Sequence, residues 1–248
     1  MSKYKYVIIN EGSHERLQWK ETLEEKDDVI IYREWRMGDN VNMNMKNKTN
    51  IFSREYEETL NIYKKLHVEG TEFNNAQNTF DGKSLKFFFH HIKQIINSTK
   101  SNSLIDFGCG KAKYYFENIK IDNITYNNIA AFWKIQKYFL YDPGVKSFSK
   151  YPSKRADGVI CIDVVEHIPE QDVIKFIEEI FRLANKFIFI VIACYPAKKK
   201  LPDGRNVHLS IKTIDDWKKI ILEIKVKYPH VSPYIICATA RKKFDAVS

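Results

Sequence analysis

From Ser103 onward, short apolar runs alternate with helical stretches, and this alternation constrains the fold more than any other feature of the sequence. The runs SLIDF, YFLYD, GVICID, KFIFIVIAC and YIICATA have the length and composition of strands. Helical patterns lie near Val173 to Ala184 and Ile214 to Ile224. Continuously apolar strands separated by helices are typical of a parallel sheet covered on both faces. We therefore expect an α/β fold with a Rossmann-like, doubly wound, mostly parallel sheet. The last run, which ARKKF follows, is a candidate antiparallel edge strand.

The residues before this pattern form an N-terminal helical extension. Two β-like runs, Tyr6 to Ile9 and Val29 to Tyr32, precede the segment SREYEETLNIYKKLHVEG, in which Ser53 is a candidate N-cap and Gly70 a stop signal. DGKSLKFFFHHIKQIINS is a second amphipathic pattern, and its expected buried face consists of Leu85, Phe88, Phe89, Ile92 and Ile96. We place the extension at residues 1–75 and the main domain at residues 76–248.

Composition narrows the class of protein. Hydrophobic residues make up 44% of the 248 positions, and neither a membrane-spanning run nor a secretory signal is recognisable, so we expect a cytoplasmic protein. Cys109, Cys161, Cys194 and Cys237 form no CxxC pair, which favours reduced thiols. The net charge of +9 could favour an anionic partner, but clusters occur only at 198–200 and 241–243. A solvated, lysine-rich surface is the simpler interpretation.

The motif LIDFGCGKA, from Leu104 to Ala112, indicates a ligand-binding loop. A buried strand ends near Asp106, and Gly108 and Gly110 then allow the backbone to approach a ligand at the carboxyl end of the sheet. A dinucleotide-binding G-x-G-x-x-G fingerprint would need a third glycine where Lys113 stands. The order D-x-G-x-G instead resembles motif I of class I S-adenosylmethionine-dependent methyltransferases, in which this loop contacts the methionine part of the cofactor.

Two further segments resemble the same family. YFLYDP ends at Asp142, where the family has an acidic residue that accepts hydrogen bonds from both ribose hydroxyls, a task that suits a carboxylate. Because Asp142 lies 142 − 106 = 36 residues after Asp106, Glu117 and Asp122 remain alternatives. ADGVICIDVVEHIPEQD resembles the fourth-strand segment and implies that Asp163 lies beside the methionine end of S-adenosylmethionine.

The motifs also limit the methyl acceptor. The Asp/Asn-Pro-Pro-Tyr turn of amino-methyltransferases is replaced by Asp163-Val-Val-Glu166, and no cysteine follows a proline as cytosine C5 chemistry would require. No Lys-Asp-Lys-Glu set for ribose methylation is assignable. A nucleic-acid substrate is therefore disfavoured, and an oxygen, or less readily a nitrogen, of a small molecule remains.

A base must remove the proton of an acceptor hydroxyl, and histidine suits this task near neutral pH. His208 lies in a polar loop after the KFIFIVIAC strand and is the preferred base, while His167, in the DVVEH turn, is the second candidate. His90 and His91 lie on an N-terminal helix. Asp163 and Glu166 could contribute to a metal site, but no clear set of ligands is visible, so we expect no metal.

The loop ACYPAKKKLPDGRNVHLSIKTIDDW resembles methyltransferases encoded with bacterial capsule and surface-polysaccharide genes. This resemblance implies an anionic sugar- or phosphate-containing acceptor, for which Lys198, Lys200 and Arg205 are candidate ligands. In relatives the N-terminal segment closes over the cofactor, so Phe80 and Gln77 are candidate contacts. An RNA or protein methyltransferase, or an inactive methyltransferase-like binding module, stays an alternative. The oligomeric state is not predicted.

Overall fold

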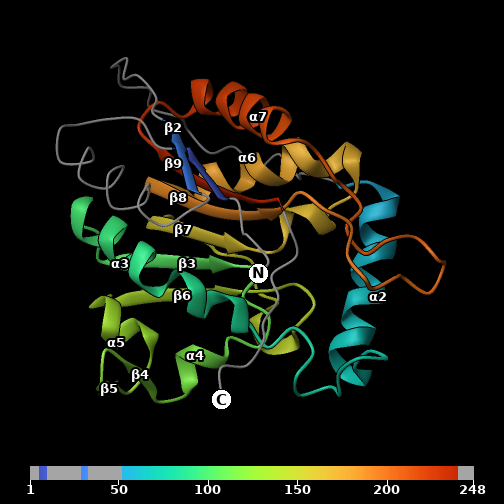
Figure 1. Ribbon diagram of the computed structural model, residues 1–248, viewed down its shortest axis with the longest axis horizontal. Coiled ribbons are helices and arrows are strands. Elements are labelled where there is room, and N and C mark those ends of the chain that lie inside the picture. Colours follow the sequence, from blue (N-terminus) through green and yellow to red (C-terminus); the bar gives the residue numbers. More distant parts are fainter. Residues whose placement is uncertain (1–5, 10–28, 33–51, 240–248) are drawn as a thin grey trace.

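The computed structural model describes residues 6–9, 29–32 and 52–239, and the statements below concern these residues. A seven-stranded sheet lies at the centre, with helices on both faces and α2 beyond the carboxyl ends of the parallel strands (Figure 1). The strands are β1 (Tyr6–Ile9), β2 (Val29–Tyr32), β3 (Ser103–Phe107), β6 (Lys137–Tyr141), β7 (Ala156–Ile162), β8 (Ala184–Ala193) and β9 (Ser232–Ala238), with a separate hairpin of β4 (Ile119–Ile121) and β5 (Ile124–Tyr126). The α-helices are α2 (Arg54–Glu69), α3 (Phe89–Ser98), α4 (Lys113–Phe116), α5 (Ile129–Trp133), α6 (Val173–Leu183) and α7 (Ile214–Lys227). Short 3₁₀ helices are η2 (Lys83–Phe88), η3 (Lys146–Phe148), η4 (Val165–His167) and η5 (Glu170–Asp172).

The central five strands are all parallel, which confirms the predicted Rossmann-like α/β fold. The sheet order is β2-β1-β9-β8-β7-β3-β6, and β6, β3, β7, β8 and β9 run in one direction. The chain passes from β3 outward to β6 and then returns across β3 to β7. The direction of winding therefore reverses between β3 and β7, and such a reversal is where open α/β sheets bind ligands.

The expectation of an antiparallel edge strand at the end of the chain is wrong. Strand β9 runs parallel to β8 and lies inside the sheet, because β1 pairs with its other side in an antiparallel register. Helix α7 supplies the crossover that returns the chain to the common direction, and six of the seven residues of β9 are buried. The edge is instead formed by β2, which is parallel to β1.

Alternation along β3 divides the apolar core into two layers. Ile105 and Phe107 face the layer that contains α6 and α7, whereas Leu104 faces the layer that contains α3, α4 and α5. Figure 1 shows these two groups of helices on opposite faces of the sheet. Helix α6 contributes a buried stripe that includes Phe176 and Ile180, at the spacing expected for a helix packed on a sheet.

The two helical patterns that precede β3 fold largely as their sequences predict. Ser53 caps α2, since its hydroxyl accepts a hydrogen bond from the Tyr56 amide at 3.1 Å, and Gly70 ends it at a φ of 89°. The second pattern divides at Phe88 into η2 and α3, but the five apolar residues of its predicted face are all buried. The cationic cluster at 241–243 lies outside the described residues.

Candidate functional site

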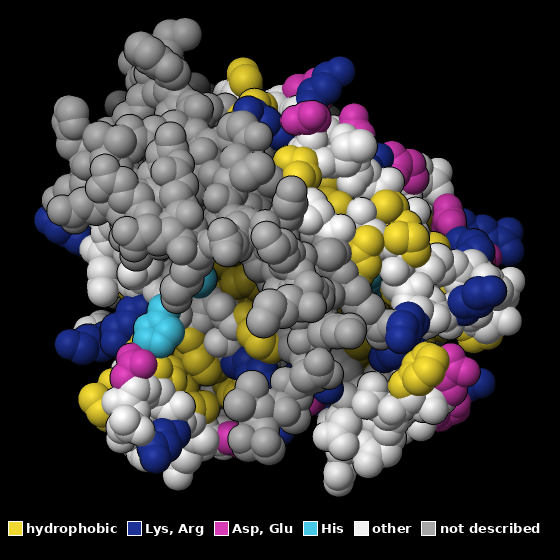
Figure 2. Space-filling view, viewed as in Figure 1, with side chains coloured by type: hydrophobic (Ala, Val, Ile, Leu, Met, Phe, Trp, Pro, Cys, Tyr) yellow, Lys and Arg dark blue, Asp and Glu magenta, His cyan; other side chains and the backbone are white. Residues whose placement is uncertain are grey.

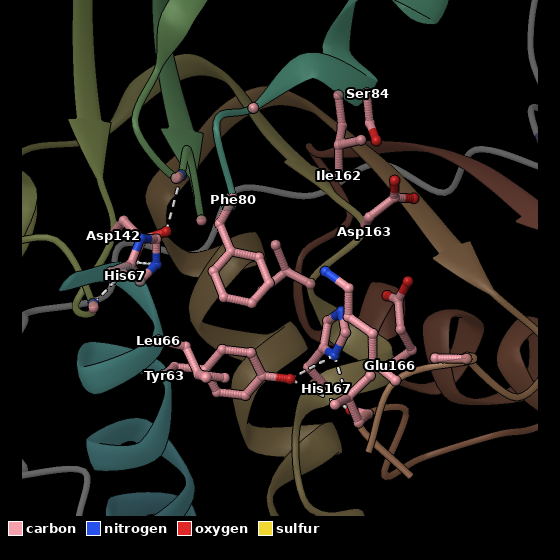
Figure 3. A pocket seen from close by; sticks show the side chains of 18 of the residues that line it. Tyr63, Leu66, His67, Phe80, Ser84, Asp142, Ile162, Asp163, Glu166 and His167 are labelled. Carbon is pink, nitrogen blue, oxygen red and sulfur yellow. Dashed lines mark hydrogen bonds and ion pairs between the residues drawn. The ribbon is translucent and has the colours of Figure 1, made fainter. Parts of the chain in front are cut away.

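A cavity of about 1050 Å³ opens along the carboxyl edge of the parallel strands, and Figure 3 shows part of it. Gly108, Asp142, Asp163 and Tyr195 line it, and they follow β3, β6, β7 and β8 respectively. Helix α2 closes the opposite side. The volume is at the upper end of the range for small-molecule sites, so the cavity has room for two ligands side by side.

The glycine loop after β3 is shaped by contacts that no other residue type would allow. Gly108 has a φ of 86°, and a Cβ on it would lie 2.4 Å from Cγ2 of Val164. Gly110 has a φ of 58°, and a Cβ there would lie 2.2 Å from the carbonyl oxygen of Phe80. The amides of Gly108 and Cys109 donate to the carbonyl oxygen of Tyr141 at 2.7 and 3.1 Å, which ties the loop to the end of β6.

Asp142 reaches this loop despite the 36 residues that separate it from Asp106. Its Oδ2 accepts a hydrogen bond from the Gly110 amide at 2.9 Å, and its Oδ1 accepts one from the Gly144 amide at 2.8 Å. His67 Nε2 lies 3.8 Å from Oδ1 (Figure 3). Each carboxylate oxygen can accept a second hydrogen bond, so Asp142 keeps acceptor capacity beside the loop.

The rival carboxylates lie elsewhere. Glu117 and Asp122 are exposed and do not line the cavity; Asp122 pairs instead with His90 at 3.7 Å. The long separation arises because the hairpin of β4 and β5 and the helix α5 fill the connection between β3 and β6.

Asp106 is buried at the base of the cavity. Burial raises the pKa of this carboxyl group to about 7, and the negative charge of Asp142 acts in the same direction. Leu104 and Asp106 occupy alternate positions of β3, so this carboxyl group faces the layer of α3, α4 and α5. Asp106 therefore supports the glycine loop from within the fold.

Two residues named from the sequence adopt left-handed backbone conformations beside the loop. Asp163 has a φ of 54°, and its amide donates to the carbonyl oxygen of Val191 at 3.0 Å. Phe80 has a φ of 51°, and its ring lies 5.4 Å from that of Tyr63 and 5.0 Å from that of His67, measured between centroids. Non-glycine residues in this region are uncommon, and they cluster at ligand-binding sites.

Helix α2 is fastened to the cavity by side chains that the sequence analysis did not single out. The hydroxyl of Tyr63 lies 2.7 Å from Nδ1 of His167. Lys111 Nζ donates to the carbonyl oxygens of His67 at 3.1 Å, of Thr79 at 3.0 Å and of Ala76. Lys111 belongs to the quoted glycine motif and Tyr63 to the helical pattern of α2, but neither role is visible in local spacing.

His167 and His208 are brought together at the other end of the cavity, with ring centroids 4.9 Å apart. His167 Nδ1 lies 2.8 Å from the carbonyl oxygen of Val207, and His208 Nδ1 lies 2.6 Å from that of Tyr195. A carbonyl oxygen can only accept, so Nδ1 of His208 carries the proton. Nδ1 of His167 likewise donates to Val207, with the Tyr63 hydroxyl as a second acceptor that itself donates to the Val207 carbonyl oxygen at 3.4 Å, and each Nε2 then keeps a lone pair. Both side chains line the cavity.

The electrostatic environment keeps these histidines neutral. Burial, followed by the charge of His208, lowers the pKa of His167 to about 4. Burial also lowers the pKa of His208. Glu166 lies beside His167 (Figure 3), is fully buried, and accepts a hydrogen bond from the Ala193 amide at 3.2 Å. Neutral imidazoles with accessible lone pairs can act as bases or as metal ligands.

The predicted acceptor ligands separate into two groups. Lys198 and Lys200 line the cavity, as does Lys199, whose Nζ lies 5.5 Å above the centre of the Phe80 ring. Arg205 is exposed and lies outside the lining; its Nε bonds Asp203 at 2.8 Å and its guanidinium also pairs with Glu55. Gln77, His90 and His91 do not line the cavity either.

The cationic side chains on the described part of one face are dispersed. Figure 2 shows Lys and Arg around the visible face, interspersed with Asp and Glu, and not gathered in one patch. Within the described ranges, no helix has the length and apolar character needed to cross a membrane. No protein-family model, curated protein or solved structure matches the chain.

Proposed function

We propose that the chain is an S-adenosylmethionine-dependent methyltransferase that acts on an oxygen of a small, anionic acceptor. The observation that carries the proposal is the joining of Gly110 and Asp142 by a hydrogen bond at the point where the sheet reverses its winding. Both belong to the segments whose sequences resemble the methyltransferase family. The residues fit the cofactor: the glycine loop would receive its methionine part, and Asp142 would receive its ribose hydroxyls.

The histidine end of the cavity supports the second half of the reaction. S-adenosylmethionine supplies a methyl group already activated by a sulfonium, so the protein has to position the acceptor and accept its proton. The acceptor oxygen forms a bond to the methyl carbon, the carbon–sulfur bond breaks, and its electron pair stays on sulfur. Nε2 of His208 is the proposed proton acceptor, and Lys198, Lys199 and Lys200 would attract an anionic acceptor.

The first experiment is calorimetric titration with S-adenosylmethionine, with S-adenosylhomocysteine and with NAD as the control nucleotide. We expect micromolar binding of the first two and none of NAD. Turnover is then screened on nucleotide-sugar and phosphorylated hydroxyl acceptors. Absence of binding to both sulfur compounds would rule out the proposal, whereas binding without turnover on any acceptor would favour a methyltransferase-like binding module.

A further inference from the structure

Three potential metal ligands meet at the histidine end of the cavity. Glu166 and His167 are adjacent in η4, directly after β7, and His208 comes from the loop after β8. One candidate ligand atom from each lies within 4.8 Å of the others, and all three residues line the cavity. Within the described residues, this is the one group of three such side chains that could hold a metal ion.

The two segments that carry the ligands are braced against each other. The carbonyl oxygen of Val207, next to His208, holds Nδ1 of His167 at 2.8 Å. Ser210 adds two hydrogen bonds between the same segments. Its amide donates to the carbonyl oxygen of Glu166 at 3.0 Å, and its hydroxyl donates to the carbonyl oxygen of Ile168 at 2.6 Å. The turn and the loop that carry the three ligands are therefore held together by hydrogen bonds to main-chain carbonyl oxygens.

The orientation of both imidazoles suits metal binding. Each Nδ1–H donates to a backbone carbonyl oxygen, from Val207 for His167 and from Tyr195 for His208. Metal-binding histidines commonly donate their second ring N–H in this way, which fixes the tautomer and raises the basicity of the other nitrogen. The available lone pair of each ring is then on Nε2.

The burial of the Glu166 carboxylate favours a cation bound beside it. Glu166 is fully buried, and one of its oxygens already accepts a hydrogen bond from Ala193. The neighbouring imidazoles contribute Nε2 lone pairs, because each Nδ1 is bound to a carbonyl oxygen. A buried carboxylate is stabilised when a cation lies close to it. The cluster therefore offers two imidazole nitrogens and one carboxylate oxygen to a positive ion.

We propose that Glu166, His167 and His208 bind one divalent transition-metal cation through the carboxylate and the two Nε2 atoms. Two nitrogens and one oxygen suit zinc, iron, cobalt or manganese, whereas magnesium and calcium prefer oxygen alone. Tetrahedral ligands at about 2.0–2.2 Å from one ion lie about 3.3–3.6 Å from each other, so binding draws the three side chains together. Three protein ligands leave a coordination position on the side of the cavity.

The role of this cation rests on the proposed function. An acceptor hydroxyl bound at the open position would lose its proton to solvent water more readily, because the metal lowers its pKa. The resulting oxygen takes the methyl group and sulfur keeps the electron pair of the broken bond. His208 then serves as a ligand that holds the acceptor through the metal, and the metal takes over the task of the base.

The test uses untagged full-length protein that has been treated with a chelator and dialysed. Zn²⁺ is titrated by calorimetry, and Co²⁺ binding is followed by its visible absorption spectrum. We expect one equivalent to bind to the natural chain and to His90→Ala, a matched control that removes an exposed histidine on α3. His208→Ala and His167→Ala should each lose more affinity than the roughly 10–100-fold that loss of an outer-shell partner costs.

Two outcomes would overturn the proposal: no saturable binding of Zn²⁺ or Co²⁺, or equal binding by the natural chain and both histidine variants. Thermal unfolding checks that each variant is folded, and His208→Ala decides the result if His167→Ala does not fold. S-adenosylmethionine affinity of the metal-free protein is measured in parallel. If the natural chain does not bind S-adenosylmethionine, the proposed function is contradicted. If it binds S-adenosylmethionine but no metal ion, only the metal site is contradicted.

Discussion

The two ends of the cavity are built in different ways. At the glycine end, main-chain atoms define the surface: the amide of Gly110 meets Asp142, and a Cβ on Gly110 would collide with Phe80. At the histidine end, side chains define it, and His167 and His208 are separated by 41 positions and by β8. The affinity for a ligand that the backbone binds depends on the shape of the loop. The affinity for a ligand that the imidazoles bind depends on a few side chains that single substitutions can remove. The two ends should therefore respond differently to substitution.

The largest effect is expected from His208→Ala. Turnover on an accepted substrate should fall by roughly 10²–10⁴-fold, the usual contribution of a positioned proton acceptor, because the variant lacks the Nε2 atom that either accepts the proton itself or holds the metal ion that replaces it in this task. Affinity for S-adenosylmethionine should stay the same, because His208 does not contact the glycine loop. Steady-state kinetics and calorimetry measure the two quantities, with His90→Ala as the control. A variant that loses cofactor affinity to the same extent as turnover would erase the distinction between the two ends.

Gly110→Ala should show the opposite behaviour. The new Cβ would approach the Phe80 carbonyl oxygen to 2.2 Å at a φ of 58°, so crowding and left-handed backbone strain together should cost about 2–5 kcal/mol of cofactor binding. Gly204→Ala is the matched control, since Gly204 has a φ of 88° but no heavy atom within 4 Å of its added Cβ. Calorimetry that gave the same affinity for both variants would disprove the role of the glycine loop.

Asp142→Asn should weaken cofactor binding by about 1.5–3 kcal/mol, the usual value of a hydrogen bond to a charged group. The carboxylate now accepts hydrogen bonds from two backbone amides, those of Gly110 and Gly144. The side-chain amide of asparagine would present its own N–H group to one of these two donors. Asp122→Asn changes the exposed rival carboxylate and should leave binding unaltered. If Asp122→Asn bound S-adenosylmethionine more weakly than Asp142→Asn, Asp122 would replace Asp142 as the assigned ribose ligand.

The effect that is smallest per pH unit concerns stability and its dependence on pH. The pKa of Asp106 is raised from 3.8 to about 7 in the folded chain, so the folded state keeps a proton that the unfolded state has lost between these values. The free energy of unfolding should therefore fall as pH rises from about 4 to 7, with a slope of at most about 1.4 kcal/mol per pH unit from this group.

Asp106→Asn should remove this slope, and the variant should gain stability relative to the natural chain as pH rises. Urea unfolding at several pH values between 4.5 and 8 measures the difference, with Asp122→Asn as a control at an exposed position. Identical slopes in Asp106→Asn and in the natural chain would show that Asp106 does not titrate in this range.

The same contrast explains what the sequence could predict. The five parallel strands and α2, α6 and α7 were predictable because apolar periodicity is local. The glycine loop was predictable because its constraint falls on consecutive residues. The neighbourhood of β9 was not, since the direction of a strand depends on the connection through α7 and on β1, which lies more than two hundred residues earlier.

The histidine end was only half predictable. His167 and His208 were both named from the sequence, but their contact, and the presence of Glu166 beside them, depend on how the loop after β8 packs on η4. The same limit applies to Arg205, which was predicted with the neighbouring lysines as an acceptor ligand. Its side chain turns to Glu55 on α2, a partner 150 positions away that no local pattern indicates.

Lys111 determines how the segment of residues 67–79 can move away from the cavity. Its single ammonium group bonds three carbonyl oxygens, of His67, Ala76 and Thr79, while its own backbone belongs to the glycine loop. These bonds share one donor group, so release of one carbonyl leaves a partly buried cation with fewer partners and weakens the hold on the others. Opening is therefore cooperative: residues 67–79 leave together or stay together. The rate at which a bulky ligand enters is then set by the population of one fully released state, and gradual fraying of the segment contributes little.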